Sequence, residues 1–198
     1  MTSLAVKHRP VDWDTIVGQK TIVETLRKQV ETETFKNSLF AGASGTGKTT
    51  IARIVGRFYN AEVREIDAAS NNGVDNIREI SDAAYSRSVS NKYKIFILDE
   101  AQMLTIQSFN ALLKILEEPP KYSLFILCTT DPQKIPVTIR TRLQRFNFNR
   151  LTTSEIVKRL SEVCDEEHFD YNDSVLEYIA KLANGSARES LSILDQVS

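Results

Sequence analysis

Residues 42–49 read GASGTGKT and fit the phosphate-binding pattern G-x-x-x-x-G-K-[ST]. A short apolar run precedes this loop and an amphipathic pattern follows it, which is the strand–loop–helix context that the pattern requires. The glycines let backbone N–H groups turn toward phosphate oxygens, and the N-terminus of the following helix adds roughly half a positive charge. The stretch therefore predicts a polyphosphate site at the end of a buried strand.

The loop supplies most of the expected nucleotide-binding residues. They are Gly42, Ala43, Ser44, Gly45, Thr46, Gly47, Lys48, Thr49 and Thr50. Lys48 is expected to reach the β- and γ-phosphates, and Thr49 is expected to ligate Mg²⁺. The alternative is a glycine-rich turn that binds nothing, and the flanking strand and helix patterns disfavour it.

A second acidic motif, IFILDE at residues 95–100, supplies the other half of such a site. Asp99 would end a buried strand next to the strand of the phosphate loop, where it can hold Mg²⁺ or its water shell. Glu100 follows it and is placed to polarise an attacking water. The alternative is a strand that simply ends in two solvated carboxylates. Paired acids favour hydrolysis over transfer to a small acceptor, because transfer enzymes exclude water.

The distribution of apolar residues predicts a doubly wound α/β domain with a parallel sheet. Three unbroken apolar runs, at residues 37–42, 94–100 and 123–130, are typical of strands covered on both faces, and a weaker run at 61–69 is typical of an edge strand. Helical stripes alternate with these runs. They comprise Ile22, Val23, Leu26 and Val30; Ile51, Ile54, Val55 and Phe58; and Phe109, Leu112, Leu113 and Leu116.

The composition changes near residue 150, which predicts a boundary between an α/β domain at 1–150 and a helical domain at 151–198. Residues 131–150 carry five basic side chains and one acidic one, whereas residues 151–180 carry two basic and eight acidic ones. Thr152 and Glu155 have capping-box spacing at the start of the first helix. The second helix is expected to bury Val175, Leu176, Ile179 and Leu182 and to end at Asn184–Gly185; the third opens with Ser186 and Glu189 and runs to Ser198.

The overall composition is that of an ordinary globular protein. Of the 198 residues, 41% are hydrophobic and 26% are charged, with a formal net charge of −1. No apolar run approaches the ~18 residues that span a bilayer, and the first residues lack the apolar region of a secretory signal, so a cytoplasmic chain without a membrane partner is expected. Cys128 and Cys164 are expected to be buried thiols. His8 and His168 lack partners at ligand spacing, which disfavours a zinc site or a Ser-His-Asp triad.

Three longer stretches make the chain recognisable: EIDAASNNGVDNIRE at 65–79, FNALLKILEEPP at 109–120 and CTTDPQKIPVTIRTR at 128–142. They resemble the clamp-loader family of AAA+ ATPases, of the gamma/tau type found in bacterial DNA polymerase III. The resemblance covers essentially the whole chain. It implies a five-stranded parallel AAA+ core and a helical lid that use ATP and Mg²⁺. It also implies a motor subunit that opens a sliding clamp and loads it onto primer–template DNA, within a ring or spiral of other clamp-loader subunits, a pentamer in the full-length protein.

The resemblance implies roles for residues outside the phosphate loop. Thr130 matches the sensor 1 position, where a hydroxyl contacts the γ-phosphate or the lytic water, and Arg188 matches sensor 2 in the lid. Arg9 and Val17 match the part that holds the adenine and ribose. Trp13 takes the place of a family aromatic residue, with core packing favoured over base stacking.

The resemblance also implies groups that act between molecules. Arg142 matches an arginine finger that reaches the ATP site of a neighbouring subunit, although the flanking Thr141 and Leu143 depart from the family's serine–arginine–cysteine motif. The alternative for Arg142 is a solvated residue in a basic stretch. Alignment with the family places DNA contacts at four positions, and for each of them a merely solvated side chain is the alternative. They are Asn71, Asn72, Arg78 and Lys114.

One departure from the family is large. The short link at residues 56–64 contains no cysteine, so the family's four-cysteine zinc module is expected to be absent, as in a compact or divergent homologue of cellular or viral origin. The collar domain is also outside these 198 residues. Three other functions stay open: a non-hydrolysing scaffold subunit, another AAA+ remodeller such as a branch-migration helicase, and a small-molecule P-loop kinase.

Overall fold

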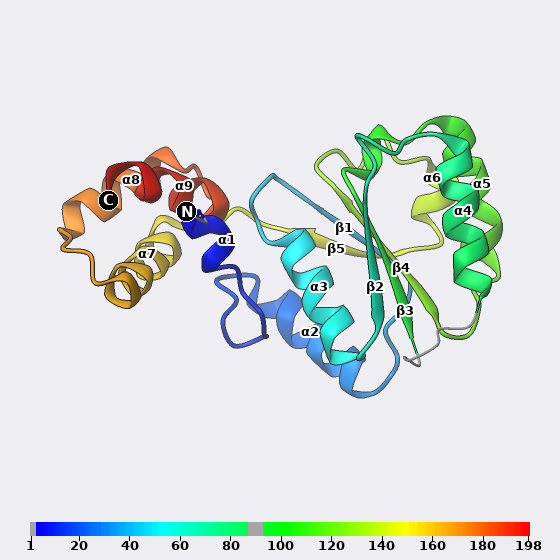
Figure 1. The fold of residues 1–198 in the computed structure, drawn as a ribbon, viewed down its shortest axis with the longest axis horizontal. Helices are drawn as coiled ribbons and strands as arrows, with labels where there is room; N and C mark the ends of the chain where they lie inside the picture. The colour runs from blue at the N-terminus through cyan, green and yellow to red at the C-terminus, as the bar shows by residue number, and fades with distance from the viewer. Residues whose placement is uncertain (1–2, 87–92) are drawn as a thin grey trace.

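The computed structural model describes residues 3–86 and 93–198, which form a helix-covered sheet with a separate group of helices beside it (Figure 1). Strands and helices alternate through the first part of the chain, and helices alone follow. The elements are α1 (Leu4–Lys7), α2 (Lys20–Glu31), β1 (Ser38–Gly42), α3 (Lys48–Phe58), β2 (Glu62–Asp67), α4 (Val74–Tyr85), β3 (Lys94–Asp99), η1 (Ala101–Met103), α5 (Ile106–Glu117), β4 (Ser123–Thr129), α6 (Val137–Arg140), β5 (Gln144–Phe148), α7 (Thr153–Glu167), α8 (Asp173–Leu182) and α9 (Ala187–Val197).

The five strands form one sheet in the order β2-β3-β4-β1-β5, and every neighbouring pair is parallel. This confirms the predicted doubly wound α/β class. The three unbroken apolar runs became the central strands β1, β3 and β4, which are buried over nearly their whole length because helices cover both faces. The weaker run became β2, an edge strand as predicted.

The fifth strand, β5, lies at the other edge of the sheet and had not been located from the sequence pattern. It pairs with β1 from Ser38 opposite Gln144 to Gly42 opposite Phe148. Phe146 and Phe148 are buried, while the intervening Asn147 is exposed. Such alternation of buried and exposed side chains is typical of a strand that is covered on one face. Here only two apolar residues produce it, and they lie in a basic segment, so the sequence pattern did not reveal the strand.

The residues on alternate sides of each strand enter two different cores. Ile95 and Ile97 pack with α2 and α3 on one face. Phe96 and Leu98 pack with α4 and α5 on the other, where the Phe96 ring stacks on Phe125 at 5.0 Å. Side chains two apart on a strand point to the same face, so a continuous apolar run supplies both cores.

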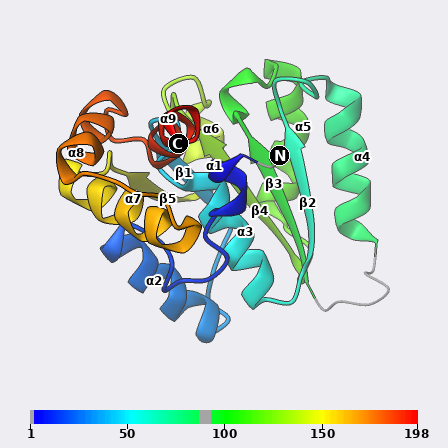
Figure 2. The same ribbon diagram turned by 60° about the vertical axis from the view of Figure 1, so that its left-hand side comes forward.

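The last three helices, α7 to α9, lie together beside the sheet (Figure 2). Their buried side chains contribute most of a third core. Helix α7 begins with the predicted capping box, in which Thr152 accepts from the backbone of Glu155 and the Glu155 carboxylate accepts from the backbone of Thr152. Ile156, Leu160 and their neighbours pack against α8 and α9. Leu4 of the N-terminal α1 also belongs to this cluster and is 5% exposed.

The predicted apolar stripes differ from the structure at a few positions. In α8 the buried residues are Leu176, Ile179 and Ala180, whereas Val175 and Leu182 are about half exposed. Phe58, at the end of α3, is also about half exposed and rests against Trp13. No helix among residues 3–86 and 93–198 has the length and apolar character needed to cross a membrane.

The contrast between Leu98 and Leu182 gives a test of this packing. Leu98→Ala is expected to lower the free energy of unfolding by about 2–5 kcal/mol, because it removes a fully buried side chain from the sheet core. Leu182→Ala, the same change at a half-exposed position, is expected to cost less than about 1 kcal/mol. Urea denaturation measures both. Equal losses for the two variants would contradict the assignment of α8's buried face.

Candidate nucleotide-binding site

The phosphate loop crosses the carboxyl edge of the sheet, between the end of β1 and the start of α3. Gly45 and Gly47 have φ values of +72° and +97°, which side chains other than glycine rarely adopt. A Cβ atom on Gly45 would lie 1.9 Å from Oγ of Ser186, and the carbonyl of Gly45 accepts a hydrogen bond of 3.1 Å from the backbone of Ala187. The loop therefore touches the first turn of the lid helix α9 directly.

Lys48 is buried and is folded back onto the loop that carries it. Its Nζ donates hydrogen bonds of 2.9 Å and 2.8 Å to the carbonyls of Gly42 and Ala43. Burial lowers the pKa of the Lys48 ammonium, and the carboxylates of Glu100 and Asp99 oppose that shift. The Lys48 ammonium is partly desolvated and has neutral carbonyls as its hydrogen-bond partners. Binding of a negatively charged polyphosphate beside it is therefore favourable.

Thr49 and Asp99 come together as a hydroxyl–carboxylate pair. Oγ1 of Thr49 donates to Oδ2 of Asp99 at 2.8 Å, although their elements are far apart in sequence. The sequence predicted that the strand ending at Asp99 (β3) lies next to the strand before the phosphate loop (β1). This prediction was wrong, because β4 lies between them. The first turn of α3 spans that gap. Both side chains line one pocket, and a hydroxyl beside a carboxylate suits Mg²⁺, which takes oxygen ligands and keeps several waters.

Glu100 and Thr130 are linked through Gln102, a residue that the sequence reasoning missed. The Nε2 of Gln102 donates to Oε2 of Glu100 at 2.5 Å and to Oγ1 of Thr130 at 3.0 Å. Its Oε1 accepts from Oγ1 of Thr129 at 2.7 Å. The end of β4 thus fixes the Gln102 amide, which holds the Glu100 carboxylate beside Thr130. The sequence gives only a weak indication of this role, which is that a polar residue, Gln102, stands two positions after the acidic pair.

One pocket collects most of the predicted nucleotide-binding residues. The phosphate loop contributes Ser44 through Thr50 to its wall, and Gly42 and Ala43 support Lys48 from behind. The remaining lining includes Arg9, Val17, Asp99, Glu100 and Arg188. Residues from the N-terminal segment, the sheet and the lid therefore face the same space.

Thr130, predicted as sensor 1, and Trp13 are not among the residues that line this pocket. Trp13 is 3% exposed within the core beside α3, 5.4 Å from the Phe58 ring, which agrees with core packing rather than base stacking. Gln19, directly after the Val17–Gly18 pair, exchanges hydrogen bonds with the backbone of Asn149 and so fastens the start of α2 to the junction between β5 and α7.

Arg142 lies at the opposite edge of the sheet from this pocket. It precedes β5, whose first residue, Gln144, pairs with the first residue of β1, whereas the phosphate loop follows the last residue of β1. A five-residue strand separates the two edges by roughly 16 Å. The Arg142 side chain is one-third exposed and forms an ion pair with Glu117. It is on the surface and not in the core.

The four predicted DNA-binding residues lie near α4 and α5. Asn71 and Asn72 belong to the loop before α4, and Asn72 is exposed. Arg78 and Lys114 are exposed side chains that line the same groove between α4 and α5. Arg78 forms an ion pair of 2.9 Å with Asp75, one turn away. The structure thus brings Arg78 and Lys114 together on one surface.

The two buried thiols are as predicted. Cys128 and Cys164 are both unpaired and buried. Burial raises the pKa of Cys128 well above its ordinary value, and the nearby Asp99 carboxylate adds to that effect. Cys128 is therefore a neutral side chain packed behind the Thr49–Asp99 pair.

A phosphate loop on a five-stranded parallel sheet, with an acidic pair two strands away and a helical lid touching the loop, defines an AAA+ nucleotide-binding fold. Solved structures agree: the Thermotoga maritima RuvB Holliday junction branch migration motor superposes with a TM-score of 0.84 over 96% of this chain and 65% of that one. Its K64R mutant gives the same score. The sequence identity is 18% in each case, so these likenesses concern the fold alone.

Sequence comparisons identify the family. Residues 61–152 match the model of the DNA polymerase III delta subunit, and residues 155–197 match that of the DNA polymerase III clamp loader subunit ATPase lid domain. The Bacillus subtilis DNA polymerase III subunit tau is 43% identical over 95% of this chain, and the Buchnera aphidicola subunit gamma is 37% identical over 97%. The chain belongs to the clamp-loader family of AAA+ ATPases and is similar to its gamma/tau subunits. It spans 38% of the B. subtilis protein and 60% of the Buchnera protein.

The contact between the loop and the lid predicts the effect of substituting Gly45. Gly45→Ala is expected to destabilise the protein by about 2–3 kcal/mol, because alanine at positive φ costs about 1–2 kcal/mol and Ser186, which caps α9, must move. Gly73→Ala is the matched control, since Gly73 has φ −71° and an added Cβ would meet only Asn76 Nδ2, at 4.0 Å. Its change is expected within about 0.5 kcal/mol. Denaturant titration gives both values, and a Gly45→Ala protein as stable as the wild type would contradict this packing.

Proposed function

We propose that this chain is the ATPase motor region of a DNA polymerase clamp-loader subunit of the gamma/tau type. Family membership supports the class of complex. The observation that carries the proposal is the Thr49–Asp99 pair, because it lies in one pocket with the phosphate loop, Glu100 and the lid residue Arg188. Such a pocket is suited to binding ATP with Mg²⁺ and to hydrolysing it.

Each residue at the carboxyl edge has a proposed role. Lys48 turns from its own loop carbonyls to the β- and γ-phosphates, and Thr49 and Asp99 hold Mg²⁺. Mg²⁺, when bound, neutralises charge on the phosphate oxygens. Glu100 orients and polarises the attacking water as general base, and the Thr130 hydroxyl contacts the γ-phosphate or that water. Gln102 keeps the last two side chains together before the nucleotide arrives.

The lid reports the state of the nucleotide in this proposal. Arg188 lies in the first turn of α9, directly after Ala187, whose backbone N–H bonds the carbonyl of Gly45. A guanidinium that pairs with the γ-phosphate would pull α9 toward the loop. Loss of the γ-phosphate would release that pairing. Arg9 and Val17 line the same pocket and are proposed to hold the adenine and ribose.

Arg142 is proposed to act on a neighbouring subunit. It is at the amino edge of the sheet, so it cannot reach the phosphates bound at its own carboxyl edge. Its side chain is at the surface, and release of its contacts with Glu117 and with the carbonyl of Thr138 would let it extend. A guanidinium supplied in trans contributes about 10³–10⁵ in rate in other phosphoryl-transfer systems. Hydrolysis would then depend on assembly.

The proposed partners follow from the family. They are other clamp-loader subunits in a ring or spiral, pentameric in the full-length protein, a sliding clamp and primer–template DNA. ATP binding would close the assembly around the opened clamp, and hydrolysis would release the clamp onto the duplex. Arg78 and Lys114, which line the same groove, are proposed to contact phosphates without reading sequence. Asn71 and Asn72 would contribute from the adjoining loop.

The absence of a zinc module is also part of the proposal. Only residues 59–61 connect α3 to β2, which is too short a link for an inserted module. A non-hydrolysing scaffold subunit is the competing function. It would not need Glu100, Gln102 and Thr130 in mutual contact, and this network therefore favours the motor.

The in-trans role is tested by mixing variants in the full-length protein assembled with its clamp and primed DNA. Lys48→Ala is expected to abolish ATP binding. Arg142→Ala is expected to keep ATP binding while steady-state ATPase activity falls at least 10³-fold. A mixture of the two should recover activity, because the Lys48→Ala subunit still donates Arg142 to its neighbour's intact site.

Arg145→Ala is the matched control, since Arg145 is an exposed basic residue of the same stretch. It should leave the rate within about twofold. Failure of the mixture to recover any activity would count against the trans arrangement. A wild-type rate that clamp and primed DNA leave unchanged would count against clamp loading itself.

A further inference from the structure

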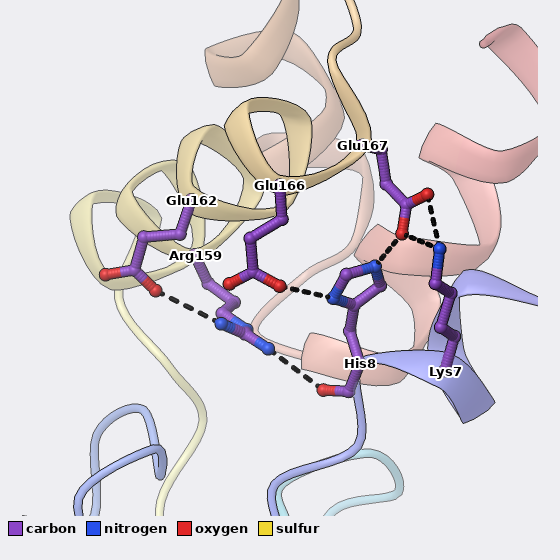
Figure 3. Close-up of polar contacts among 6 residues, drawn as sticks. All are labelled: Lys7, His8, Arg159, Glu162, Glu166 and Glu167. Carbon is purple, nitrogen blue, oxygen red and sulfur yellow. Dashed lines mark hydrogen bonds and ion pairs between the residues drawn. The ribbon is translucent and has the colours of Figure 1, made fainter.

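The end of α1 is fastened to the end of α7 by a cluster of charged side chains (Figure 3). The His8 ring is 6% exposed and lies between two carboxylates: Nδ1 is 3.1 Å from Glu166, and Nε2 contacts Glu167. Lys7 reaches the same Glu167 at 2.6 Å. The end of α1 and the residue that follows it therefore pack directly against the acidic end of α7.

Arg159 holds the backbone of the same residue. It comes from the middle of α7, and its guanidinium donates to the carbonyl oxygen of His8 at 3.0 Å and to Glu162 at 3.2 Å (Figure 3). The Arg159 side chain is 12% exposed. Side chains of α7 therefore contact both the ring and the main-chain carbonyl of His8. We call this set, Arg159, Glu166 and Glu167 around His8, the His8 latch.

Packing attaches α1 to the lid as well. Leu4 is buried among the lid residues of α7, α8 and α9 and not in either core of the sheet. A helix of four residues has too few hydrogen bonds to offset the cost of its first turn, so α1 depends on that support. Contact with the sheet layer begins a little later, where Arg57 of α3 donates to the carbonyl of Val11 and where Trp13 is buried.

The nucleotide pocket lies where the chain crosses between these two attachments. His8, Arg9, Pro10 and Arg159 all line it, together with the phosphate loop. With the phosphates at the loop, as the proposed function has them, these residues are the part of the wall available to the nucleoside. The position of Arg9 and Pro10 then depends on the latch on one side and on Val11 and Trp13 on the other.

We propose that residues 4–8 belong to the lid as one body, and that the His8 latch positions Arg9 and Pro10 for the nucleoside of the bound nucleotide. His8, Arg159 and Glu167 are thus positioning residues that set nucleotide affinity. This inference rests on the proposed nucleotide site. Freeing the latch would leave the pocket wall ordered in only a fraction of molecules, and the apparent dissociation constant rises by the inverse of that fraction. Fixing the backbone of one residue costs conformational entropy that corresponds to roughly a 5- to 30-fold change in the population of the ordered state.

Nucleotide binding is the first arm of the test. Isothermal titration calorimetry with ATP and Mg²⁺ is performed on the wild type, His8→Ala, Glu167→Gln and the double variant. Each single variant is expected to raise the dissociation constant about tenfold, and the double variant no further, because both remove the same latch. Glu177→Gln is the matched control: Glu177 is an exposed lid carboxylate on α8 paired with Lys181. It should bind as the wild type does.

Hydrogen exchange without nucleotide is the second arm, and it separates the two proposals. In Glu167→Gln the amides of residues 6–9 are expected to exchange at least tenfold faster, while those of α3 keep their wild-type rates. Unchanged exchange at residues 6–9 would overturn the latch whether or not ATP binds. Faster exchange with an unchanged ATP affinity would overturn its effect on the pocket. A wild type that binds no ATP refutes the proposed nucleotide site, and exchange then still decides whether α1 belongs to the lid.

Discussion

All five strands run in the same direction, so their carboxyl ends lie along one edge of the sheet, and the chemistry of the molecule depends on this arrangement. The phosphate loop leaves β1 there, Asp99 and Glu100 leave β3, and Thr130 leaves β4. An antiparallel neighbour would have carried one of these groups to the far edge. Parallel pairing needs helical crossovers, and these cover both faces and keep the central strands dry.

The same edge is where the lid meets the sheet. Gly45 lacks a side chain and approaches Ser186 so closely that the first turn of α9 rests on the phosphate loop. Nucleotide in the pocket would therefore contact both bodies at once, through Lys48 on one side and Arg188 on the other. The N-terminal α1 is a third participant, because its buried leucine and the ion pair of Lys7 with Glu167 attach it to the lid, although the chain then enters the sheet layer.

The amino edge has a different function in this account. Arg142 lies there, a strand's length from its own phosphate loop, with an exposed side chain and one ion pair. In the proposed mechanism, a single subunit has at one edge a site that uses a donated cation, and at the other edge the Arg142 guanidinium, which cannot reach its own site. Head-to-tail assembly would satisfy both requirements of that proposal, and such contacts generate rings or open spirals.

Several features of this protein were determined by the sequence alone, because short consecutive stretches encode them. The phosphate loop with its two left-handed glycines, the buried strands ending at Gly42 and Asp99, and the capping box of Thr152 and Glu155 each involve fewer than ten residues. Local sterics, hydrogen bonding and burial on both faces suffice to predict them. The family motifs extended this to the class of protein.

Tertiary structure decided what depends on distant residues meeting. In the folded sheet, β4 lies between β1 and β3. Residues of a basic segment form the strand β5 because they pair with β1. Gln102 became the link between Glu100 and Thr130 because β4 ends beside η1, and His8 was enclosed by carboxylates about 160 positions away. No local pattern records such contacts, since the free energy that favours them comes from packing and charge pairing between elements that are adjacent only in the folded chain.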